Sequence, residues 1–474
     1  MNHPHLHLST NIGPIHFSGI GGIGMSGIAE ILHNLGYKVQ GSDLAENANT
    51  QRLKEMGVTI FTPQEAQNIN GASVVVRSSA VKNNNPEIIA ARADNIPVIL
   101  RADMLAEIMR LKTSIAIAGT HGKTTTTSLV TAIFAKSGID PTVINGGILN
   151  AYGTNARLGQ SDWLIAEADE SDGTFLCLPA TVGVITNIDP EHMEHYGDFD
   201  TLKKAFRNFI EQLPFYGFGV LCADHPVVDD MANTIEDRTI ITYGINNEKA
   251  MIRAINIEST ALGSTFDVAV NTRNKKQTIG SITLPMPGIH NILNSLAAIA
   301  IGVELDFNDH IIKEGLAHFE GVKRRFTKVD TVNNVTIIDD YAHHPTEIKA
   351  TLDTAVSVSQ HQGGKLIAVV QPHRYSRLND LFEAFADSVM NADTVIITSV
   401  FAAGEQPIDG VDHASLAKHI CDQGHKACYT CEDEQELASL IHKHSQPNDL
   451  VVCMGAGSIS KWAYNLPEAL KTHA

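Results

Sequence analysis

The sequence predicts an α/β protein of three domains. Two glycine-rich stretches, near residues 20 and 120, each follow an apolar strand pattern and precede a helical pattern. A third region, after residue 322, alternates short β-branched runs with helical patterns. Strands that alternate with helices in this way build mostly parallel sheets covered by helices. At 474 residues, the chain is long enough for about three such domains. The predicted boundaries are 1–110, 111–321 and 322–474.

Composition narrows the range of partners. The formal net charge of −18 argues against nucleic acid or an anionic membrane as the main partner, because both favour a basic surface. No signal peptide is evident, and no apolar run approaches the ~20 residues of a membrane helix. We therefore expect a cytoplasmic protein, a monomer or a weak homodimer, that acts on small molecules.

The first glycine-rich stretch, "HFSGIGGIGMSGIAEIL", has the G-x-G-x-x-G spacing in Gly19, Gly21 and Gly24. Asp43 ends a second strand, "YKVQGSD", about twenty residues later. This pattern predicts a Rossmann-like N-terminal domain, in which glycines let the backbone approach a diphosphate at a helix N-terminus. The same pattern fits a dinucleotide-dependent dehydrogenase, and it does not specify the nucleotide.

The second stretch, "GTHGKTTTT", begins at Gly119 directly after the strand "SIAIAG". In a P-loop the backbone N–H groups hold phosphate, the lysine reaches the β and γ phosphates, and the next hydroxyl binds Mg²⁺. Lys123 and Thr124 fit these roles. Ile117 stands where the usual first glycine would be, so the motif is the shortened G-x-x-G-K-T. We predict a central P-loop ATPase-like domain with a mostly parallel sheet; a simple dehydrogenase has no use for ATP.

Acidic residues cluster at the ends of the next two predicted strands, "DWLIAEADESDGTF" and "VGVITNIDPEHMEHYGDF". In a parallel sheet these strand ends lie at the same edge as the P-loop, where carboxylate, hydroxyl and imidazole groups suit a divalent cation. Glu167 and His192 are the preferred ligands. For the others the alternative is helix capping; these are Asp169, Asp172, Glu191 and Glu194.

A second metal pattern, near residue 428, is weaker. Cys421, His425, Cys428 and Cys431 lie close together, and the last two form a C-x-x-C. However, "KACYTC" is typical of a short strand whose alternate side chains point to opposite faces, and there is no second C-x-x-C pair. We expect no zinc site here.

Seven motifs, of which the P-loop is the first, occur in a fixed order along the chain. The motifs are "GTHGKTTTT", "AEADESD", "NIDPEHM", "PGIHNILNSLAA", "KRRF", "DDYAHHPTE" and "QPHRYSR". With these motifs the sequence resembles the Mur ligases. The resemblance that they carry covers nearly the whole chain, from Ile15 to about Leu466.

The resemblance implies a reaction and its cofactors. The muramyl carboxylate of UDP-N-acetylmuramate takes the γ-phosphoryl group of ATP, and the amine of L-alanine then displaces phosphate from the acyl phosphate. The implied cofactors are ATP and Mg²⁺, for which Mn²⁺ could substitute. Cations are required because both reactants of the first step are negatively charged. The alternative within the family is a ligase that recycles a murein tripeptide.

The resemblance also implies residue roles, and it implies a Rossmann-like C-terminal domain that receives the amino acid. The implied ATP site comprises Gly119, Thr120, His121, Gly122, Lys123, Thr124, Thr125, Asn291, Asn294, Arg325 and Asp340. The implied UDP-sugar site comprises Gly19, Gly21, Gly22, Gly24, Met25, Ser42, Asp43, Ser78 and His121. The amino-acid site comprises Tyr341, His344, His373 and Arg374. The metal ligands are Thr124, Glu167 and His192, and the catalytic residues are Lys123, His192, Arg325, Asp340 and His343.

Some alternatives stay open. Arg324 competes with Arg325 on spacing alone, and Asn294 could simply begin a helix. No general base is chosen among the histidines of the third domain. Sister ligases carry a carbamylated lysine after the histidine ligand, and that role is assigned here to none of Lys203, Lys204 and Arg207.

Overall fold

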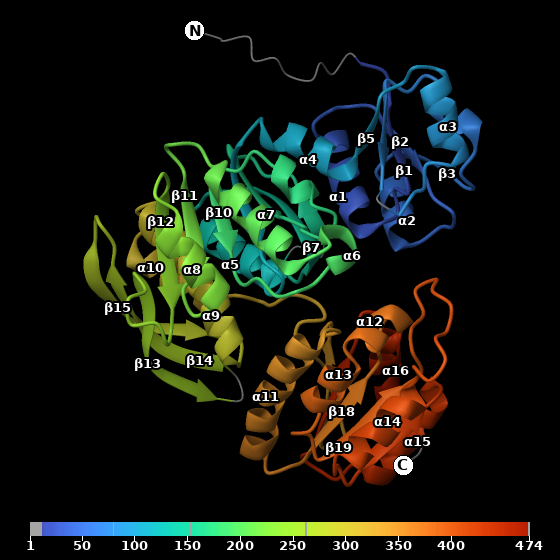
Figure 1. Ribbon diagram of the computed structural model, residues 1–474, viewed down its shortest axis with the longest axis vertical. Coiled ribbons are helices and arrows are strands. Elements are labelled where there is room, and N and C mark those ends of the chain that lie inside the picture. The colour runs from blue at the N-terminus through green and yellow to red at the C-terminus, as the bar shows by residue number, and fades with distance from the viewer. Residues whose placement is uncertain (1–11, 79, 152–153, 261–262, 473–474) are drawn as a thin grey trace. The chain divides into compact units, whose positions relative to one another are not determined.

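The structure, a computed structural model, describes residues 12–78, 80–151, 154–260 and 263–472. It confirms the predicted α/β class, because its strands form three mostly parallel sheets covered by helices (Figure 1). By internal contacts the chain divides into two compact units. Unit 1 comprises 1–256, 267–282 and 293–320, and unit 2 comprises 257–266, 283–292 and 321–474. The N-terminal sheet and most of the central sheet lie in unit 1, so the boundary at residue 110 stays a prediction.

The N-terminal sheet is parallel throughout and has the order β3-β2-β1-β4-β5. Helix α1 packs with α2 and α4, while α3 packs with the short helix η1, so both faces are covered. The glycine-rich loop follows β1, at the centre of this sheet. The elements are β1 (Ile15–Ser18), α1 (Ile23–Asn34), β2 (Val39–Ser42), α2 (Ala48–Glu55), β3 (Thr59–Phe61), η1 (Ala66–Ile69), β4 (Val74–Arg77), α3 (Pro86–Ala93), β5 (Val98–Leu100) and α4 (Arg101–Met109).

The central sheet has ten strands in the order β15-β14-β13-β12-β11-β10-β6-β9-β7-β8. The strands from β13 through β10 and β6 to β7 pair in parallel, and β8 is antiparallel to β7. The P-loop strand β6 lies between β10 and β9, which carry the predicted acidic ends. The elements are β6 (Thr113–Ala118), α5 (Lys123–Lys136), β7 (Thr142–Leu149), β8 (Thr154–Arg157), β9 (Trp163–Glu167), η2 (Thr174–Cys177), β10 (Val182–Ile185), α6 (Met193–Tyr196), α7 (Phe199–Glu211), β11 (Phe218–Cys222), α8 (Pro226–Thr234), β12 (Thr239–Gly244), β13 (Ile252–Thr260), β14 (Gly263–Asn271), β15 (Lys276–Leu284), α9 (Ile289–Glu304) and α10 (Asp309–Ala317).

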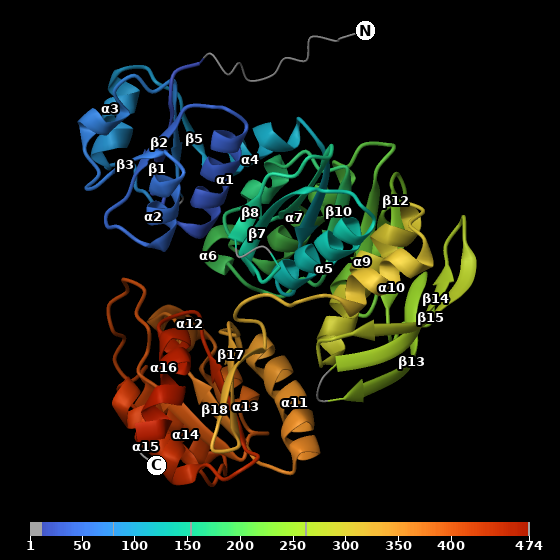
Figure 2. The ribbon, with the colours of Figure 1, turned by 180° about the vertical axis from the view of Figure 1, so that it is seen from behind.

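The C-terminal sheet has the order β16-β17-β21-β18-β19-β20 and is parallel except for β16. Its strands β17 and β18 are labelled in Figure 2, beside the helices α11 and α13. Its β-branched runs alternate between two separate cores, as expected when both faces of a parallel sheet are buried. The elements are β16 (Thr327–Val332), β17 (Val335–Asp340), α11 (Pro345–Gln362), β18 (Leu366–Val370), α12 (Tyr375–Asp380), α13 (Phe382–Ser388), β19 (Thr394–Thr398), α14 (His413–Asp422), β20 (Cys428–Cys431), α15 (Glu434–His444), β21 (Leu450–Met454) and α16 (Ile459–Thr472).

The cysteine motif lies on a strand, as predicted. Cys428 and Cys431 are the two ends of β20. Cys428 packs against the core under α11, α13 and α14, whereas Cys431 belongs to the core under α15 and α16. Their side chains therefore lie on opposite faces of the sheet and do not converge on one point.

A buried carboxylate, Glu87 of α3, ties the N-terminal sheet together. It accepts hydrogen bonds from the Ser18 hydroxyl at 2.5 Å, the Ser42 hydroxyl at 2.7 Å and the Asn68 amide at 2.9 Å. His16 Nε2 lies 3.2 Å from it, and both side chains are fully buried. Burial alone would raise the pKa of Glu87. The hydrogen bonds from His16 and Ser18 and the charge of His16 act in the opposite direction and outweigh burial, so the pKa lies below its usual value.

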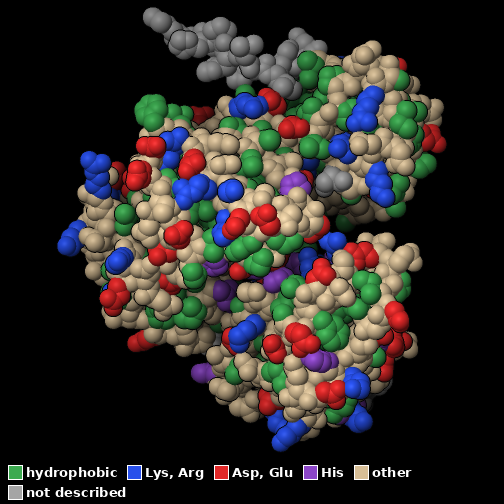
Figure 3. All heavy atoms as spheres, viewed as in Figure 1, with side chains coloured by type: hydrophobic (Ala, Val, Ile, Leu, Met, Phe, Trp, Pro, Cys, Tyr) green, Lys and Arg blue, Asp and Glu red, His purple; other side chains and the backbone are tan. Residues whose placement is uncertain are grey.

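Among the described residues, no helix is long and apolar enough to cross a membrane. On the face seen in Figure 3, acidic and basic side chains lie interspersed, and the basic ones do not gather into a stripe.

The Glu87 network predicts the cost of its removal. Replacing Glu87 by alanine would leave His16 and two serines buried without their acceptor, so we expect the opening free energy of the β1 and β2 amides to fall by about 3 kcal/mol or more. Native-state hydrogen exchange would measure this. Because the folded pKa is lowered, the stabilisation is present above the unfolded pKa of about 4.3 and is lost as pH falls through the folded pKa.

The matched control for this variant is Glu65→Ala, which removes an exposed carboxylate from the same domain. It is expected to change the opening free energy by no more than about 0.5 kcal/mol. Equal effects of the two substitutions would contradict a structural role for the buried network.

Candidate active site

The P-loop joins β6 to α5 through two glycines with positive φ. Gly119 has φ +131° and Gly122 has φ +82°. A Cβ on Gly119 would lie 2.0 Å from the Thr186 hydroxyl oxygen, and one on Gly122 would lie 2.4 Å from the Asn294 side-chain oxygen. Conformation and space both require glycine at these positions. The loop is thus packed tightly against the end of β10 and against α9.

Lys123, at the start of α5, is folded back over this loop. Its ammonium donates to the carbonyl oxygens of Gly119 at 2.6 Å and Thr120 at 3.1 Å, and it lies 2.8 Å from a carboxylate oxygen of Glu170. Glu170 follows β9, and its side chain is only 3% exposed. Burial works against the charged lysine, but Glu170 and Glu167 outweigh it and raise the pKa of Lys123. Burial also raises the pKa of Glu170, against the attraction of Lys123.

Thr124 and Glu167 form an oxygen-rich corner beside Lys123. The Thr124 hydroxyl donates to a Glu167 carboxylate oxygen at 2.8 Å, and the Gly146 N–H donates to the same oxygen at 2.9 Å. A hydroxyl and a carboxylate at the edge of a phosphate loop are the donors that Mg²⁺ prefers. These two residues therefore fit the predicted cation.

His192 lies at the end of the β10 loop, at the N-terminus of α6, with φ +58°. Its imidazole has carboxylates on several sides: Glu191 at 3.7 Å, Glu170 at 3.9 Å and Glu194 at 3.9 Å. Burial lowers its pKa, although the charges of Glu191, Asp169 and Glu194 oppose this, and the lowered pKa favours the neutral ring that ligates metals. An imidazole among carboxylates suits Mn²⁺ better than Mg²⁺.

Asp189 anchors a histidine pair at the same sheet edge. Nε2 of His121 lies 3.4 Å and Nε2 of His225 lies 3.5 Å from its carboxylate oxygens. Hydrogen bonds from these two histidines, more than any other cause, hold the pKa of Asp189 well below its usual range. The Asn187 side chain accepts from the His121 N–H at 2.7 Å. The loop histidine is therefore held at both its backbone and its ring.

Further residues of the predicted ATP site, two threonines of the P-loop motif and two asparagines of α9, are buried. Thr120 and Thr125 are buried, and Asn294 accepts from the Thr126 hydroxyl at 3.3 Å. The structure brings Asn294 to within contact of Gly122, so it does more than begin a helix. Asn291 belongs to unit 2, and its side-chain amide donates to the Pro287 carbonyl at 2.8 Å.

The first glycine loop is held by side chains that follow β2. The Gly21 N–H donates to one carboxylate oxygen of Asp43 at 2.7 Å, and the Leu44 N–H donates to the other at 2.7 Å. The Asn49 amide donates to the Gly21 carbonyl at 2.9 Å. A Cβ on Gly21 would lie 2.4 Å from the Asn47 amide nitrogen. The observed contacts of Asp43 thus fix the loop itself.

The remaining predicted UDP-sugar residues surround this loop. Ser42 donates to Glu87, and Met25 is buried in α1. A Cβ on Gly24 would contact Arg101 at 3.1 Å, and one on Gly19 would contact Ser78 at 3.3 Å. Gly22 caps the start of α1 and donates to the Gly19 carbonyl at 3.3 Å.

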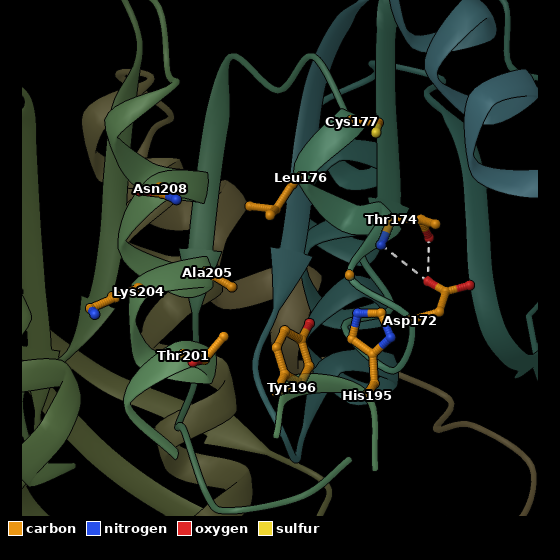
Figure 4. Close-up of a pocket in the computed structure, with 11 residues that line it drawn as sticks. Asp172, Thr174, Leu176, Cys177, His195, Tyr196, Thr201, Lys204, Ala205 and Asn208 are labelled. Carbon is orange, nitrogen blue, oxygen red and sulfur yellow. Dashed lines mark hydrogen bonds between the residues drawn. The ribbon is translucent and has the colours of Figure 1, made fainter. Parts of the chain in front are cut away.

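A hollow of about 460 Å³ lies beside Glu170, between η2, α6 and α7 (Figure 4). Its wall includes Tyr196, whose hydroxyl donates to the Glu170 carbonyl at 2.5 Å, and Asp172, which accepts from the Thr174 N–H at 3.1 Å. Asp172 precedes the N-cap residue of η2, which is Gly173, and bonds to the first residue of that helix. Lys204 lies on the α7 side of the hollow, with its ammonium turned away from His195 and Tyr196.

Unit 2 carries its own polar cluster at the ends of β17 and β18. Asp340 ends β17 and accepts from the N–H groups of Phe326 and Ala342, each at 2.7 Å. Burial raises its pKa to about 6, although Arg325 opposes the shift. The two candidate arginines differ in their contacts: Arg324 donates to the Gly455 carbonyl at 2.6 Å, whereas Arg325 lies 3.9 Å from Glu347. Both guanidinium groups lie over the Tyr341 ring.

The histidines near the ends of β17 and β18 differ in their contacts. His343 Nδ1 lies 3.2 Å from Glu347, and its ring lies 6.1 Å from that of His373. Burial, followed by the charge of Arg377, lowers the pKa of His373 to about 4. His344 caps α11, since its Nδ1 accepts from the Thr346 N–H at 3.3 Å. Arg374 Nε donates to Glu405 at 2.7 Å.

Family models match three consecutive parts of the chain. The Mur ligase family catalytic domain covers 14–113, the Mur ligase middle domain covers 117–302, and the Mur ligase glutamate ligase domain covers 324–457. The chain belongs to the Mur ligase family. Mur ligases are ATP-dependent enzymes, so the predicted family, enzyme class and use of ATP are confirmed.

Individual relatives are similar over nearly their whole length. A UDP-N-acetylmuramate–L-alanine ligase of Brucella ovis is 54% identical over 461 residues, which is 97% of this chain and 98% of that protein. One of Rhodospirillum rubrum is 55% identical over 466 residues, or 98% and 96%. The crystal structure of UDP-N-acetylmuramate-alanine ligase MurC from Thermotoga maritima has a TM-score of 0.81 at 29% identity and covers 98% of this chain and 100% of its own.

Several residues of this Mur ligase site were not predicted from sequence as site residues. The acidic run that contains Glu170 was recognised from sequence, but Glu170 itself was not predicted as a site residue. Arg101, which lies 3.4 Å from Asp169, and Glu405 follow no local motif. Only their contacts in the folded chain reveal them.

A pair of glycine variants tests the packing of the P-loop. Gly122→Ala and Gly138→Ala both place alanine at φ +82°, but only the first meets another atom, because nothing lies within 4 Å of a Cβ on Gly138. We expect Gly138→Ala to cost about 1–2 kcal/mol of stability and to leave ATP affinity unchanged. Gly122→Ala should also displace Asn294 and weaken ATP binding at least tenfold.

Thermal unfolding and equilibrium dialysis with ATP would measure the two effects. If Gly122→Ala bound ATP as tightly as Gly138→Ala does, close packing at Gly122 would not be needed for the nucleotide site.

Proposed function

We propose that this chain joins L-alanine to the muramyl carboxylate of UDP-N-acetylmuramate at the expense of ATP, as a cytoplasmic step of peptidoglycan synthesis. The observation that carries the proposal is the identity of 54% and 55%, over 97% and 98% of the chain, to relatives named for this reaction. A murein peptide ligase of Psychrobacter arcticus shares the fold at a TM-score of 0.71 and only 23% identity. This difference favours L-alanine over a tripeptide.

In the first step, a carboxylate oxygen of the substrate attacks the γ-phosphorus of ATP. The new P–O bond forms as the bond to ADP breaks, giving an acyl phosphate. Lys123 is charged and lies over the loop. When ATP is bound, its ammonium would leave Glu170 and contact the oxygens of the phosphoryl group that is transferred.

Thr124 and Glu167 would hold Mg²⁺, and His192 would hold a second divalent ion. Bound there, the metal supplies positive charge that neutralises the phosphate oxygens. The glycine loop after β1 would place the UDP diphosphate at the N-terminus of α1, which carries no side-chain cap. This site contains no lysine or arginine of the loop itself, which suits a diphosphate that is bound but not cleaved.

In the second step the amine of L-alanine attacks the acyl carbon, and phosphate leaves as the amide forms. The attacking amine must lose a proton. His373, with a pKa of about 4, stays neutral and is a weak base at neutral pH. His343 is the better candidate, because Glu347 at 3.2 Å orients the ring. Arg325 and Asp340 would complete the ATP site, and Tyr341, His344, His373 and Arg374 would line the amino-acid site.

The decisive experiment measures phosphate release from ATP and Mg²⁺ by the purified chain. We expect release only when UDP-N-acetylmuramate and L-alanine are both present, with the amide product confirmed by mass spectrometry. Omission of either substrate is the control. Release with the tripeptide L-alanyl-γ-D-glutamyl-meso-diaminopimelate but not with L-alanine would move the assignment to the recycling ligase.

Removal of the proposed metal ligand should change the metal requirement. Glu167→Gln keeps the shape of the side chain but removes the charge, so we expect at least a tenfold rise in the Mg²⁺ concentration that gives half-maximal rate. Glu194→Gln, which alters a more exposed carboxylate near His192, is the matched control. A Glu167→Gln enzyme with an unchanged Mg²⁺ titration would exclude Glu167 as a ligand.

A further inference from the structure

The loop after β19 binds the backbone of the predicted amino-acid site. Strands β18 and β19 are parallel neighbours, so the segments that follow them emerge at one sheet edge. There the Phe401 N–H donates to the Pro372 carbonyl at 2.8 Å, and the Arg374 N–H donates to the Phe401 carbonyl at 2.9 Å. The Phe401 ring stacks on His373, with ring centroids 5.4 Å apart and planes 9° apart. The two segments therefore form one unit.

Glu405, four residues further along this loop, completes the contact. One carboxylate oxygen accepts from Arg374 Nε at 2.7 Å and from the Ser376 hydroxyl at 2.7 Å, and the other accepts from the Ser376 N–H at 2.9 Å. Burial works against the charged carboxylate, but the N–H of Ser376 and the side chains of Arg374 and Ser376 lower the pKa of Glu405 to about 2. The carboxylate is thus charged at any working pH.

The backbone beneath Arg374 needs this support. Arg374 has φ +72°, a conformation that costs a residue with a side chain on the order of 1–2 kcal/mol. Behind it, Gln371 is fixed by a hydrogen bond from its side chain to Ser458 at 3.1 Å and by one from the Ile459 N–H at 3.0 Å. Gly457 lets Phe401 approach, since a Cβ there would lie 2.5 Å from the ring. Anchors on both sides therefore fix the direction in which Arg374 leaves the backbone.

We propose that Glu405 is a positioning residue that holds the Arg374 guanidinium to receive the carboxylate of the incoming amino acid. The inference rests on the proposed function, which places Arg374 in the amino-acid site. A guanidinium binds a carboxylate through a planar fork, and a bond at Nε fixes the plane of that fork before the substrate arrives. Fixing it in advance removes the entropic cost of ordering a long side chain during binding.

The charge balance also fits a carboxylate-binding role. An isolated glutamate here would repel the substrate, but the charge of Glu405 is paired with Arg374. His373 is neutral, with a pKa of about 4, and Arg377 lies 3.5 Å from it through Nη1. The cluster of Arg374, Arg377, His373 and Glu405 thus has a net charge of about +1 at neutral pH, which attracts an anion.

The test compares Glu405→Gln and Glu405→Ala with Glu383→Gln. Glu383 is a matched control, because it also pairs with a cation-forming side chain of this domain, His419 at 2.7 Å, and is 72% exposed. We expect Glu405→Ala to raise the KM for L-alanine at least tenfold, with kcat and the KM for ATP changed less than threefold. Glu405→Gln should fall between Glu405→Ala and the unaltered chain, because its amide oxygen still accepts one hydrogen bond.

Two further measurements separate positioning from general folding damage. In the double variant Glu405→Ala with Arg374→Ala, the second change should add little, because the glutamate acts through the arginine. Thermal unfolding should show that Glu405→Ala remains folded. Additive effects, or equal losses in the KM for L-alanine and ATP, would overturn the proposal.

A readout without turnover keeps this inference distinct from the proposed function. The ¹⁵N-labelled Nε–H signal of Arg374, identified by its loss in Arg374→Lys, should be slow to exchange in the unaltered chain and should shift or vanish in Glu405→Gln. Absence of L-alanine turnover by the unaltered chain would refute the proposed function. An Arg374 signal that Glu405→Gln leaves unchanged would refute the positioning role, whatever the substrate.

Discussion

The strand order β10-β6-β9 is the constraint on which the phosphate site depends. Because these three neighbours are parallel, their carboxyl ends share one edge, and the chain places there the P-loop, the Glu167 to Glu170 run and the loop that ends at His192. The buried pair of Lys123 and Glu170 is possible only at such an edge, since 47 residues separate the two in sequence. Each of these groups would be costly to bury alone, and together they satisfy one another.

Two buried asparagines connect this edge to the first glycine loop. Asn145 of β7 donates to the Ser128 hydroxyl at 2.9 Å and to the Thr124 carbonyl at 3.4 Å, on the helix that begins at Lys123. Asn155 of β8 donates to the Ile23 carbonyl at 2.9 Å, at the start of α1. Gly27 of α1 leaves no room for a side chain against Ala156, so the helix packs directly on β8. Helices α1 and α5 are therefore both anchored to one hairpin.

Much of this architecture follows from local sequence signals. Apolar runs and glycine-rich turns predicted the strands β1, β6, β9 and β10, and the motif order predicted the family. What local signals missed are contacts between segments far apart in sequence. Glu405 lies 31 residues from Arg374, and no spacing rule links them. Asp43, predicted as a UDP-sugar residue, shows another such contact: one of its oxygens accepts from the Gly21 N–H of the first glycine loop, and the other accepts from the adjacent Leu44 N–H.

The contrast between the two glycine loops agrees with their different chemical tasks. A diphosphate that only needs to be held can be bound by backbone N–H groups and a helix N-terminus, and the loop after β1 offers those at the start of α1. A phosphoryl group that moves needs a cation at the place where charge develops, and the loop after β6 adds Lys123 and the Thr124–Glu167 corner. The Glu170 contact keeps that lysine charged and folded over the loop, so its positive charge lies at the phosphate site before ATP binds.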